Sequence, residues 1–431
     1  MSTGDSPLPP RIGKYPVRQL LGRGATSEVY QCHDPFTGRD VAVKVVYPET
    51  FNDPERGRLY RKLFVTEASL AGKLRHPHIC QILDAVAGEE LHYIVMEYVE
   101  GGTLEPYCHP ERLLPLERVL EIGFKCARAL EYAQKMGIIH RDIKPANILY
   151  RGDSDVKITD FGAALVATGD TTQISAVGSP AYMSPEQVRE QPLDHRTDIY
   201  SLGVVLYHLL AGRLPFDATN NFALVYQITH VEPAPPSTHR AGLPPELDAI
   251  VLRAMAKDLE ARYPDWESFS AALAALGRLK GVGVPPSEIA DSDKFETLRR
   301  LAFFAHFTDA QLWEVARIAD WRHVPAGEAL MREGERGENF CLLAEGQVSV
   351  TRKGKLLNVL SAGECFGEMA YLRGAGLRSA DVTAVIPSRV IAVPIDRLEA
   401  ASEGCRHAFD RAFLKILVER LAMANLRLSG V

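Results

Sequence analysis

The feature that most constrains this chain is the short stretch 140–149, which reads His-Arg-Asp-Ile-Lys-Pro-Ala-Asn-Ile-Leu. It places a carboxylate at Asp142, a cation at Lys144 and an amide at Asn147 close together, and a second carboxylate, Asp160, follows in Asp-Phe-Gly. One carboxylate can orient an attacking hydroxyl, while the other carboxylate and the amide can hold Mg²⁺ (or Mn²⁺) against phosphates. Because phosphoryl transfer requires this set of groups, we expect the fold to gather them in one site.

These residues resemble the catalytic loop and the metal motif of protein kinases, H-R-D-x-K-x-x-N followed by D-F-G. The resemblance implies that Asp142 orients the substrate hydroxyl and accepts its proton. It also implies that Lys144, which matches the Ser/Thr form of the loop, steadies the γ-phosphate of ATP. Asn147 and Asp160 would then bind the metal ion.

Upstream, two stretches have the pattern of strands. Residues 17–21 run into a turn with glycines at 22 and 24, and the apolar run 41–46 carries Lys44. Glycine lets the backbone approach a phosphate closely, where a side chain would clash. Together they resemble the kinase glycine-rich loop and its phosphate-pairing lysine. The third glycine of that motif is replaced by Ser27, so we expect slightly reduced loop flexibility and retained nucleotide binding.

A helix is predicted at 58–74 by its apolar spacing, and Glu67 lies on the apolar side. A carboxylate there would be costly unless it were paired. The resemblance implies that Lys44 is its partner, in the ion pair that marks the active arrangement of kinases. The alternative is a solvated helix glutamate.

The next expected strand, 91–99, leads into the segment that resembles the hinge between the two kinase lobes. By that resemblance, main-chain groups of Glu97 and Val99 bond the adenine edge, and Met96 lies at the back of the pocket. The residues expected to bind ATP are Leu21, Gly22, Arg23, Gly24, Ala25, Thr26, Ser27, Val29, Ala42, Lys44, Met96, Glu97, Val99 and Leu149.

The stretch after Asp-Phe-Gly is small and polar and ends in Ser184-Pro-Glu, which resembles the A-P-E end of an activation segment with serine in place of alanine. Arg141 would leave a buried cation that a phosphate on this segment could neutralise. We therefore predict autophosphorylation at Thr171, Thr172 or Ser175.

The resemblance continues to the end of a helical large lobe and covers about residues 12–276. It implies that Asp198 holds the backbone of the catalytic loop and that Arg262 pairs with Glu186. It is closest to the eukaryotic-like Ser/Thr kinases of bacteria.

Beyond residue 295, short strands alternate with regularly spaced glycines, which predicts a sandwich or jelly roll. The run 342–350 is the clearest expected strand. Phe-Gly-Glu-Met at 366–369 with Arg-Ser at 378–379 resembles the phosphate-binding cassette of cyclic-nucleotide-binding domains, although Leu377 replaces the proline that often precedes the arginine. The residues expected to bind the ligand, cAMP or cGMP, are Gly367, Glu368, Met369, Arg378 and Ser379.

The final helix, predicted at 407–428, carries Phe409, Phe413 and Leu417 on one face. That stripe fits packing on its own domain, a homodimer seam or a lid over the ligand. A domain that only dimerises or docks, without ligand, is therefore the alternative to a sensor.

Composition excludes several other classes. The net charge of −6 argues against a sequence-independent nucleic-acid binder. The seven scattered cysteines fit reduced thiols, and no apolar run reaches the roughly 20 residues that span a bilayer. We therefore expect a cytoplasmic protein.

The sequence as a whole predicts an α+β chain. After a disordered stretch at 1–11 come a bilobal kinase fold at 12–276, with a β-rich small lobe, and a linker at 277–295. A β jelly roll with flanking helices follows at 296–431. The expected activity is transfer of the γ-phosphoryl group of ATP to protein Ser or Thr, regulated by a cyclic nucleotide. A pseudokinase scaffold is the alternative, which the presence of all five expected kinase residues disfavours; these are Lys44, Glu67, Asp142, Asn147 and Asp160.

Overall fold

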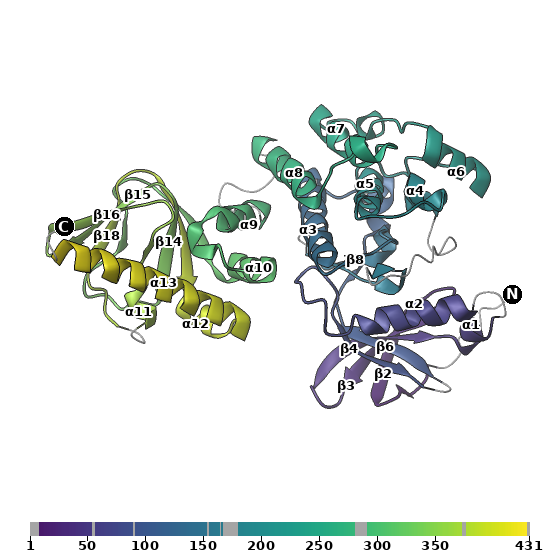
Figure 1. Cartoon of the computed structure of the whole chain (residues 1–431), viewed down its shortest axis with the longest axis horizontal. Coiled ribbons are helices and arrows are strands. Elements are labelled where there is room, and N and C mark those ends of the chain that lie inside the picture. Colours follow the sequence, from purple (N-terminus) through teal and green to yellow (C-terminus); the bar gives the residue numbers. More distant parts are fainter. Residues whose placement is uncertain are drawn as a thin grey trace. The chain divides into compact units, whose positions relative to one another are not determined.

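The computed structural model describes residues 8–53, 57–88, 91–152, 155–163, 165–166, 180–280, 291–372 and 376–428. The chain forms two compact units, Met1–Gly283 and Val284–Val431 (Figure 1). The division lies inside the expected linker 277–295, whose outer limits remain a prediction. The candidate phosphorylation residues Thr171, Thr172 and Ser175 lie outside the described residues.

The first unit begins with a six-stranded antiparallel sheet in the order β1-β2-β3-β4-β6-β5. Helix α2 packs on this lobe through Phe64, whose ring meets His92 edge-on at 5.6 Å between centroids. Cys32, Val43 and Val95 belong to a second apolar cluster, which is distinct from the core that contains Phe64. The elements are β1 (Arg11–Ile12), β2 (Tyr15–Arg23), β3 (Ser27–Asp34), β4 (Arg39–Val46), α1 (Pro48–Asn52), α2 (Gly57–Ser69), β5 (Ile82–Ala87) and β6 (His92–Glu97).

Helix α2 is shorter than the predicted helix at 58–74, because it ends at Ser69. Leu70 and Leu74 are nevertheless buried, from the turn that follows the helix. The spacing of apolar residues indicates which side chains are buried, but it does not indicate which backbone groups form helical hydrogen bonds. The apolar pattern can therefore continue past the residue at which the helix ends.

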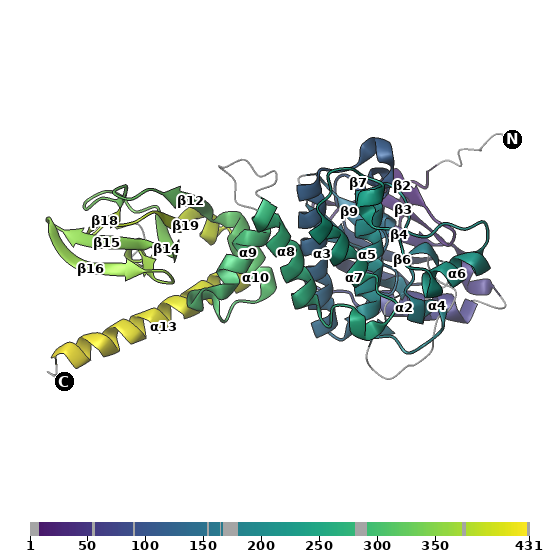
Figure 2. The same ribbon diagram turned by 90° about the horizontal axis from the view of Figure 1, so that it is seen from above.

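The large lobe is helical, and its helices α3, α5 and α7 lie side by side (Figure 2). Helix α5 is apolar on nearly all sides and is buried almost throughout, as expected of a core helix. It stops at Gly212, which adopts a left-handed backbone with φ of 70°. The helices are α3 (Leu116–Lys135), α4 (Pro185–Val188), α5 (Arg196–Ala211), α6 (Asn221–His230), α7 (Pro245–Ala254) and α8 (Trp266–Lys280).

Helix α8 continues to Lys280, and helix α9 of the second unit begins at Asp291. Both ends of the expected linker 277–295 are therefore helical. Gly277 does not stop α8, because glycine inside a helix costs only about 1 kcal/mol relative to alanine.

Two small sheets position the stretch 140–149. Strand β8 (Ile138–Ile139) enters it and pairs with β11 (Leu165–Val166). Strand β9 (Ile148–Tyr150) leaves it and lies between β7 (Gly102–Thr103) and β10 (Val156–Ile158). The loop and Asp160 are thus fixed at both ends by backbone pairing.

The second unit is a pair of four-stranded antiparallel sheets with flanking helices, in the orders β12-β19-β14-β17 and β13-β18-β15-β16. Its core includes Val324, Leu343, Val348 and Val390. The strands are β12 (Asp320–Val324), β13 (Ala329–Met331), β14 (Asn339–Glu345), β15 (Gln347–Arg352), β16 (Lys355–Ser361), β17 (Cys365–Phe366), β18 (Asp381–Ala384) and β19 (Ser388–Pro394). The helices are α9 (Asp291–Arg300), α10 (Asp309–Ile318), α11 (Met369–Leu372), α12 (Ile395–Glu399) and α13 (Glu403–Leu428). The predicted α+β class is confirmed.

The single strand expected at 342–350 is wrong: it is two strands, β14 and β15, separated at Gly346. Gly346 has φ of 100°, and a Cβ there would lie 2.2 Å from the Ser388 hydroxyl oxygen. The chain must break at this residue, because only glycine tolerates both the backbone conformation and the contact.

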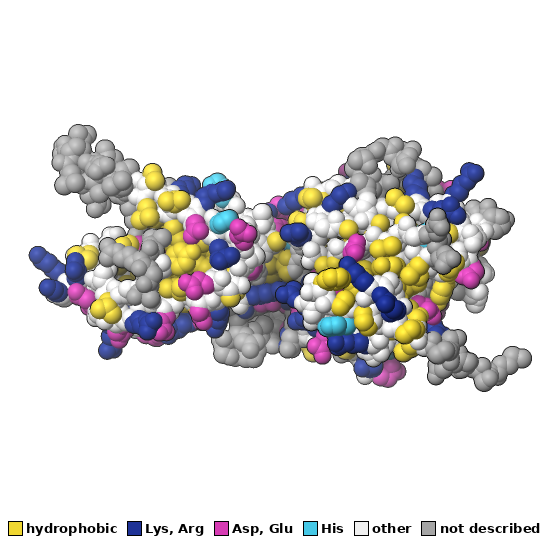
Figure 3. All heavy atoms as spheres, turned by 90° about the horizontal axis from the view of Figure 1, so that it is seen from below, with side chains coloured by type: hydrophobic (Ala, Val, Ile, Leu, Met, Phe, Trp, Pro, Cys, Tyr) yellow, Lys and Arg dark blue, Asp and Glu magenta, His cyan; other side chains and the backbone are white. Residues whose placement is uncertain are grey.

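The final helix, α13, packs on its own unit through Phe409 and Phe413, which join an aromatic cluster with Phe303 and Phe340. Leu414, one residue further, is 63 % exposed. Across the described parts of the chain, every helix is too short or too polar to span a membrane. On the face in Figure 3, Lys and Arg side chains are interspersed with Asp and Glu.

Candidate functional sites

Within the loop 140–149, the carboxylate of Asp142 is held by two donors. Lys144 Nζ lies 2.7 Å from Asp142 Oδ2, and Asn147 Nδ2 donates to the same oxygen at 3.0 Å and to the Asp142 carbonyl at 2.8 Å. Both contacts use Oδ2, so among the described residues Oδ1 is the oxygen left to meet a hydroxyl group. The Asn147 amide faces Asp142 with its nitrogen, so its Oδ1 is the atom that could meet a cation.

The backbone of the loop is held by Asp198, which is 3 % exposed at the start of α5. Its carboxylate accepts hydrogen bonds from the N–H of His140 at 2.7 Å and of Arg141 at 2.8 Å. Burial raises the pKa of Asp198, against the opposing effect of these donors and nearby cations. Arg141 takes a left-handed backbone with φ of 70°, which is uncommon outside glycine and requires such support.

Facing the loop, Lys44 on β4 contacts two carboxylates. Its Nζ lies 3.1 Å from Glu67 Oε2 on α2 and 2.7 Å from Asp160 Oδ1. Burial opposes the charge on Lys44, but the two carboxylates outweigh it and raise the pKa of Lys44. Burial likewise opposes the charge on Asp160, and attraction by Lys44 lowers the pKa of Asp160 below its ordinary value. Asp160 is therefore anionic at neutral pH.

A cavity of about 140 Å³ joins these groups to the turn between β2 and β3. Its lining includes Thr26 and Ser27 from that turn together with Lys44, Asp142 and Asp160. The turn is closed by a hydrogen bond from the Gly24 N–H to the Ser27 carbonyl at 2.8 Å. Both lobes of the unit thus contribute to one hollow, whose walls carry the Lys44 cation and carboxylates together with apolar side chains such as Val46 and Phe64.

The other residues expected to bind ATP extend from this hollow along the sheet. Ala42 and Met96 are paired neighbours on β4 and β6, 7 % and 8 % exposed. The Glu97 N–H donates to the Gln81 carbonyl at 2.9 Å, and the Glu97 carbonyl accepts from the Cys80 thiol at 3.6 Å, so the second lone pair of that carbonyl is the main-chain acceptor that an adenine could use. Of the remaining residues expected to bind ATP, three are half-buried, namely Val29, Val99 and Leu149. The others are exposed near the turn between β2 and β3, namely Leu21, Gly22, Arg23, Gly24 and Ala25.

The donor set fits a magnesium ion. Mg²⁺ prefers oxygen ligands and is usually held by one or two protein groups together with substrate phosphates. Asp160 and Asn147 supply such a pair. Within the described residues, no group of three or more His, Cys, Asp or Glu side chains is placed to hold a metal ion.

In the second unit, Arg378 lies against Gly367. Its Nη1 donates to the Gly367 carbonyl at 3.1 Å, and its Nη2 donates to the carbonyl and the side-chain oxygen of Asn339 at 2.8 and 2.9 Å. Partial burial lowers the pKa of Arg378. Gly367 has φ of 76°, and a Cβ there would lie 2.7 Å from Arg378 Nη1, so glycine is required beside the guanidinium.

The remaining cassette residues differ in exposure. Glu368 is 5 % exposed, Met369 is 37 % exposed, and Ser379 lies at the surface directly after Arg378. The structure therefore brings Gly367 and Arg378 into contact and places Ser379 beside them.

Two residues were missed by the sequence reasoning. Asn339 begins β14 and has no local motif that points to Arg378. Gln187 occupies the fourth position of Ser-Pro-Glu-Gln, which is a visible capping-box signal; its contact with the catalytic loop is a tertiary feature.

Comparisons with known proteins identify two families along the chain. A family model described as "Protein kinase domain" matches residues 15–269, and one described as "Cyclic nucleotide-binding domain" matches residues 321–404. The chain is 42% identical over 260 residues to a probable serine/threonine-protein kinase of Streptomyces coelicolor, covering 58% of this chain and 38% of that protein. It is also 42% identical over 258 residues to the serine/threonine-protein kinase PknB of Mycolicibacterium smegmatis, covering 58% of this chain and 41% of the relative.

A probable serine/threonine-protein kinase of Clostridium perfringens is 36% identical over 284 residues, which cover 65% of this chain and 41% of that protein. The chain spans less than half the length of these curated relatives. The kinase model, by contrast, covers more than half of this chain. The chain belongs to the protein kinase family, and its kinase domain is followed by a cyclic-nucleotide-binding domain.

Proposed function

We propose that this protein is a Ser/Thr protein kinase that transfers the γ-phosphoryl group of ATP to serine or threonine hydroxyls of other proteins. One observation carries the proposal: Asp142, held by Lys144 and Asn147, shares a cavity with the Lys44–Asp160 pair. Asp142 Oδ1 accepts the proton of the substrate hydroxyl, and Lys144 lies beside it to contact the transferred phosphoryl group.

The remaining residues of the site orient the nucleotide. Lys44, fixed by Glu67, pairs with phosphate oxygens, and the exposed turn between β2 and β3 offers backbone N–H groups to them. When bound by Asp160 and Asn147, Mg²⁺ (or Mn²⁺) neutralises charge on the phosphates. The apolar surface of Ala42, Met96 and Leu149 suits the adenine ring.

The test is transfer of label from γ-labelled ATP to a generic protein substrate by the purified chain. Loss of a positioned general base costs about 10²–10⁴ in rate, so Asp142→Asn should reduce labelling by that factor. Asp217→Asn changes an exposed aspartate of the same unit and should retain wild-type labelling. Equal labelling by wild type and Asp142→Asn would refute the role of Asp142, and an unlabelled wild type would favour a pseudokinase scaffold.

We also propose autophosphorylation at Thr171, Thr172 or Ser175. In support, Arg141 is 8 % exposed, and its burial lowers the pKa of the guanidinium although Asp198 attracts its charge. A phosphate nearby would stabilise this buried cation further. Mass spectrometry after incubation with Mg-ATP should find phosphate on this segment, and unmodified peptides spanning it would contradict the proposal.

We infer further that the second unit binds a cyclic nucleotide, cAMP or cGMP, and that the ligand regulates the kinase. Arg378 and Gly367 support this, because a guanidinium beside a glycine backbone can grip a phosphate bidentately. Glu368 is the candidate acceptor for a ribose hydroxyl.

Thermal unfolding with each nucleotide tests the binding. A ligand at one hundred times its dissociation constant should stabilise the unit by about 2.7 kcal/mol. Arg378→Ala should abolish the shift, whereas Arg406→Ala, at an exposed arginine of the same unit, should preserve it. No shift at saturating ligand, with no binding of a fluorescent analogue, would leave a domain that only docks or dimerises.

A further inference from the structure

Gln187, the third residue of the short helix α4, makes two hydrogen bonds with different partners. Its Oε1 accepts from the N–H of Ser184 at 3.0 Å, which closes the capping box of α4. Its Nε2 donates to the carbonyl oxygen of Arg141 at 2.8 Å. One side chain thus ties the start of α4 to the residue that immediately precedes Asp142.

The two partners fix which way the amide of Gln187 points. A backbone N–H can only donate and a carbonyl oxygen can only accept. If the amide were flipped, its NH₂ group would face the Ser184 N–H and its oxygen would face the Arg141 carbonyl. The observed orientation is therefore the only one that satisfies both neighbours.

The contact holds the peptide plane that leads into Asp142. The Arg141 carbonyl and the Asp142 N–H belong to the same planar group. At one end, Gln187 donates to the carbonyl; at the other, the Asp142 N–H donates to His140 Nδ1 at 3.3 Å. The orientation of this plane sets the backbone angle φ of Asp142. It therefore also sets the direction in which the Asp142 side chain leaves the backbone.

Arg141 needs this support because its left-handed backbone is costly. A residue in this region costs of order 1–3 kcal/mol unless its surroundings over-determine it. Asp198 fixes the N–H of Arg141, and Gln187 fixes its carbonyl. The residue is therefore clamped on both sides by two different helices, α5 and α4.

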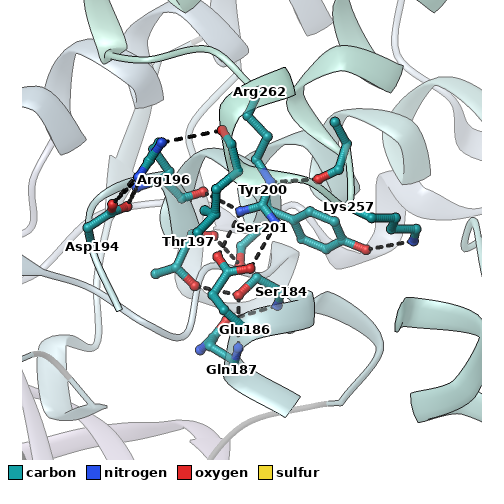
Figure 4. Close-up of polar contacts among 12 residues, drawn as sticks. Ser184, Glu186, Gln187, Asp194, Arg196, Thr197, Tyr200, Ser201, Lys257 and Arg262 are labelled. Carbon is teal, nitrogen blue, oxygen red and sulfur yellow. Dashed lines mark hydrogen bonds and ion pairs between the residues drawn. The ribbon is translucent and has the colours of Figure 1, made fainter. Parts of the chain in front are cut away.

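Helix α4 is itself firmly placed (Figure 4). Ser184, which stands where the family pattern has alanine, is fully buried, and its hydroxyl bonds the hydroxyl of Thr197 at 2.6 Å. Glu186 forms a bidentate ion pair with Arg262 at 2.7 and 2.8 Å. Gln187 thus projects from a helix that is held in place by buried polar contacts. A residue that positions another side chain needs such a rigid support.

We propose that Gln187 is a positioning residue for Asp142, acting through the Arg141–Asp142 peptide. This inference rests on the kinase function proposed above. Gln187 touches neither nucleotide residues nor the Asp142 carboxylate in the contacts described, so its effect should fall on kcat and leave KM for ATP unchanged.

The decisive variant is Gln187→Glu. Glutamate at this position keeps the acceptor of the capping box and suits the N-terminal turn of a helix. It removes the donor to the Arg141 carbonyl and places an anionic oxygen against it. A misplacement of about 1 Å costs roughly 10²-fold, so we expect kcat to fall by about tenfold to hundredfold, with KM for ATP within about twofold of wild type.

The pH dependence of the activity of Gln187→Glu distinguishes a positioning role from a merely structural one. A protonated carboxyl group can donate through its O–H. The deficit of Gln187→Glu relative to wild type should therefore shrink as the pH falls from 8 to about 5.5, where a half-buried glutamate that faces a carbonyl oxygen begins to bind a proton.

Gln227→Glu is the matched control, because Gln227 Nε2 also donates to a backbone carbonyl, that of Asp217, at 3.1 Å on the exposed surface. It should keep wild-type kcat at every pH. If Gln187→Glu follows this control, or loses activity equally at all pH values, the positioning role is refuted.

Hydrogen exchange separates this proposal from the kinase function on which it rests. Backbone amides of residues 140–144 should exchange faster in Gln187→Glu than in wild type and Gln227→Glu, whether or not the protein transfers phosphate. Equal exchange in all three would overturn the clamp. An inactive wild type with faster exchange in Gln187→Glu would defeat the kinase proposal while keeping the clamp.

Discussion

At the scale of single residues, three aspartates in one site are given different properties by their neighbours. Asp160 is held anionic by the Lys44 ammonium at 2.7 Å. Asp198 is buried, and both of its carboxylate oxygens accept hydrogen bonds from backbone N–H groups. Asp142 has one oxygen engaged by Lys144 and Asn147. One residue type thus serves as a metal ligand candidate, a structural clamp and a base candidate, because the contacts around each carboxylate differ.

A testable consequence at this scale concerns His208 on α5. Burial lowers the pKa of His208 to about 4, and the nearby His109 adds to the effect. Its Nδ1 lies 2.8 Å from the Tyr182 hydroxyl, which can donate to the neutral ring. In the unfolded chain a histidine has a pKa near 6.5, so the unfolded state binds the proton first as the pH falls.

The kinase unit should therefore lose stability between about pH 6.5 and pH 4, and His208 should contribute at most about 3 kcal/mol, less where solvent reaches the ring. Urea unfolding at several pH values measures the slope. His208→Asn should flatten it, whereas His239→Asn, at an exposed histidine of the same unit, should not. Identical slopes for all three proteins would show that His208 is not the titrating group.

Candidate roles could be assigned from the sequence where a linear motif carries the residues. Asp142, Lys144 and Asn147 stand in one loop, and Lys44 stands in a recognisable strand. Asn339 and Gln187 could not be found in this way, because their partners, Arg378 and Arg141, lie 39 and 46 residues away in the chain. A contact of that kind depends on how elements pack, which no local spacing encodes.

At the scale of elements, the large lobe is locked by one buried ion pair between α4 and the segment before α8. The Arg262 side chain is fully buried, contacts both oxygens of Glu186 and donates through Nε to the Ala256 carbonyl at 2.6 Å. Its guanidinium also lies over the Tyr200 ring at 4.9 Å. Since all three nitrogens of this guanidinium donate to protein oxygens, the geometry of the pair can compensate for its desolvation.

Breaking this pair on one side should be more harmful than removing it altogether. Arg262→Met leaves the Glu186 carboxylate buried without its partner, which costs about 3–5 kcal/mol. Glu186→Met should cost a similar amount. The double variant should be closer to wild type than the sum of the two, and a cycle of urea denaturation midpoints and slopes measures the difference. Additive losses would indicate that the two side chains do not stabilise each other.

Elements were easier to predict than their ends. The long apolar run 199–211 predicts a buried helix, because strands are rarely this long, and it lies within α5 with Gly203 inside it. The predicted helix at 58–74 and strand at 342–350 failed at Ser69 and Gly346. In both cases buried apolar side chains still follow this residue, although the backbone no longer continues the same helix or strand. The spacing of apolar residues indicates burial alone.

At the scale of the whole molecule, the proposed regulation requires a coupling free energy between two sites in different units. If a cyclic nucleotide changes the affinity for an ATP analogue by some factor, the ATP analogue must change the affinity for the cyclic nucleotide by the same factor. Typical couplings correspond to about 5- to 150-fold. We expect a factor in this range for whichever of cAMP and cGMP binds.

The measurement is a pair of titrations on the full chain: a fluorescent cyclic nucleotide with and without saturating non-hydrolysable ATP, and the reverse. The two factors should agree, because both describe one thermodynamic cycle. Arg378→Ala should remove the coupling and leave the affinity for the ATP analogue without cyclic nucleotide unchanged, since Arg378 lies in the other unit. A factor of one in both directions, with each ligand still binding, would mean that the two units work independently. In that case the cyclic-nucleotide-binding domain would serve the kinase in some way other than by shifting its equilibrium, because a ligand that binds two states equally cannot favour either.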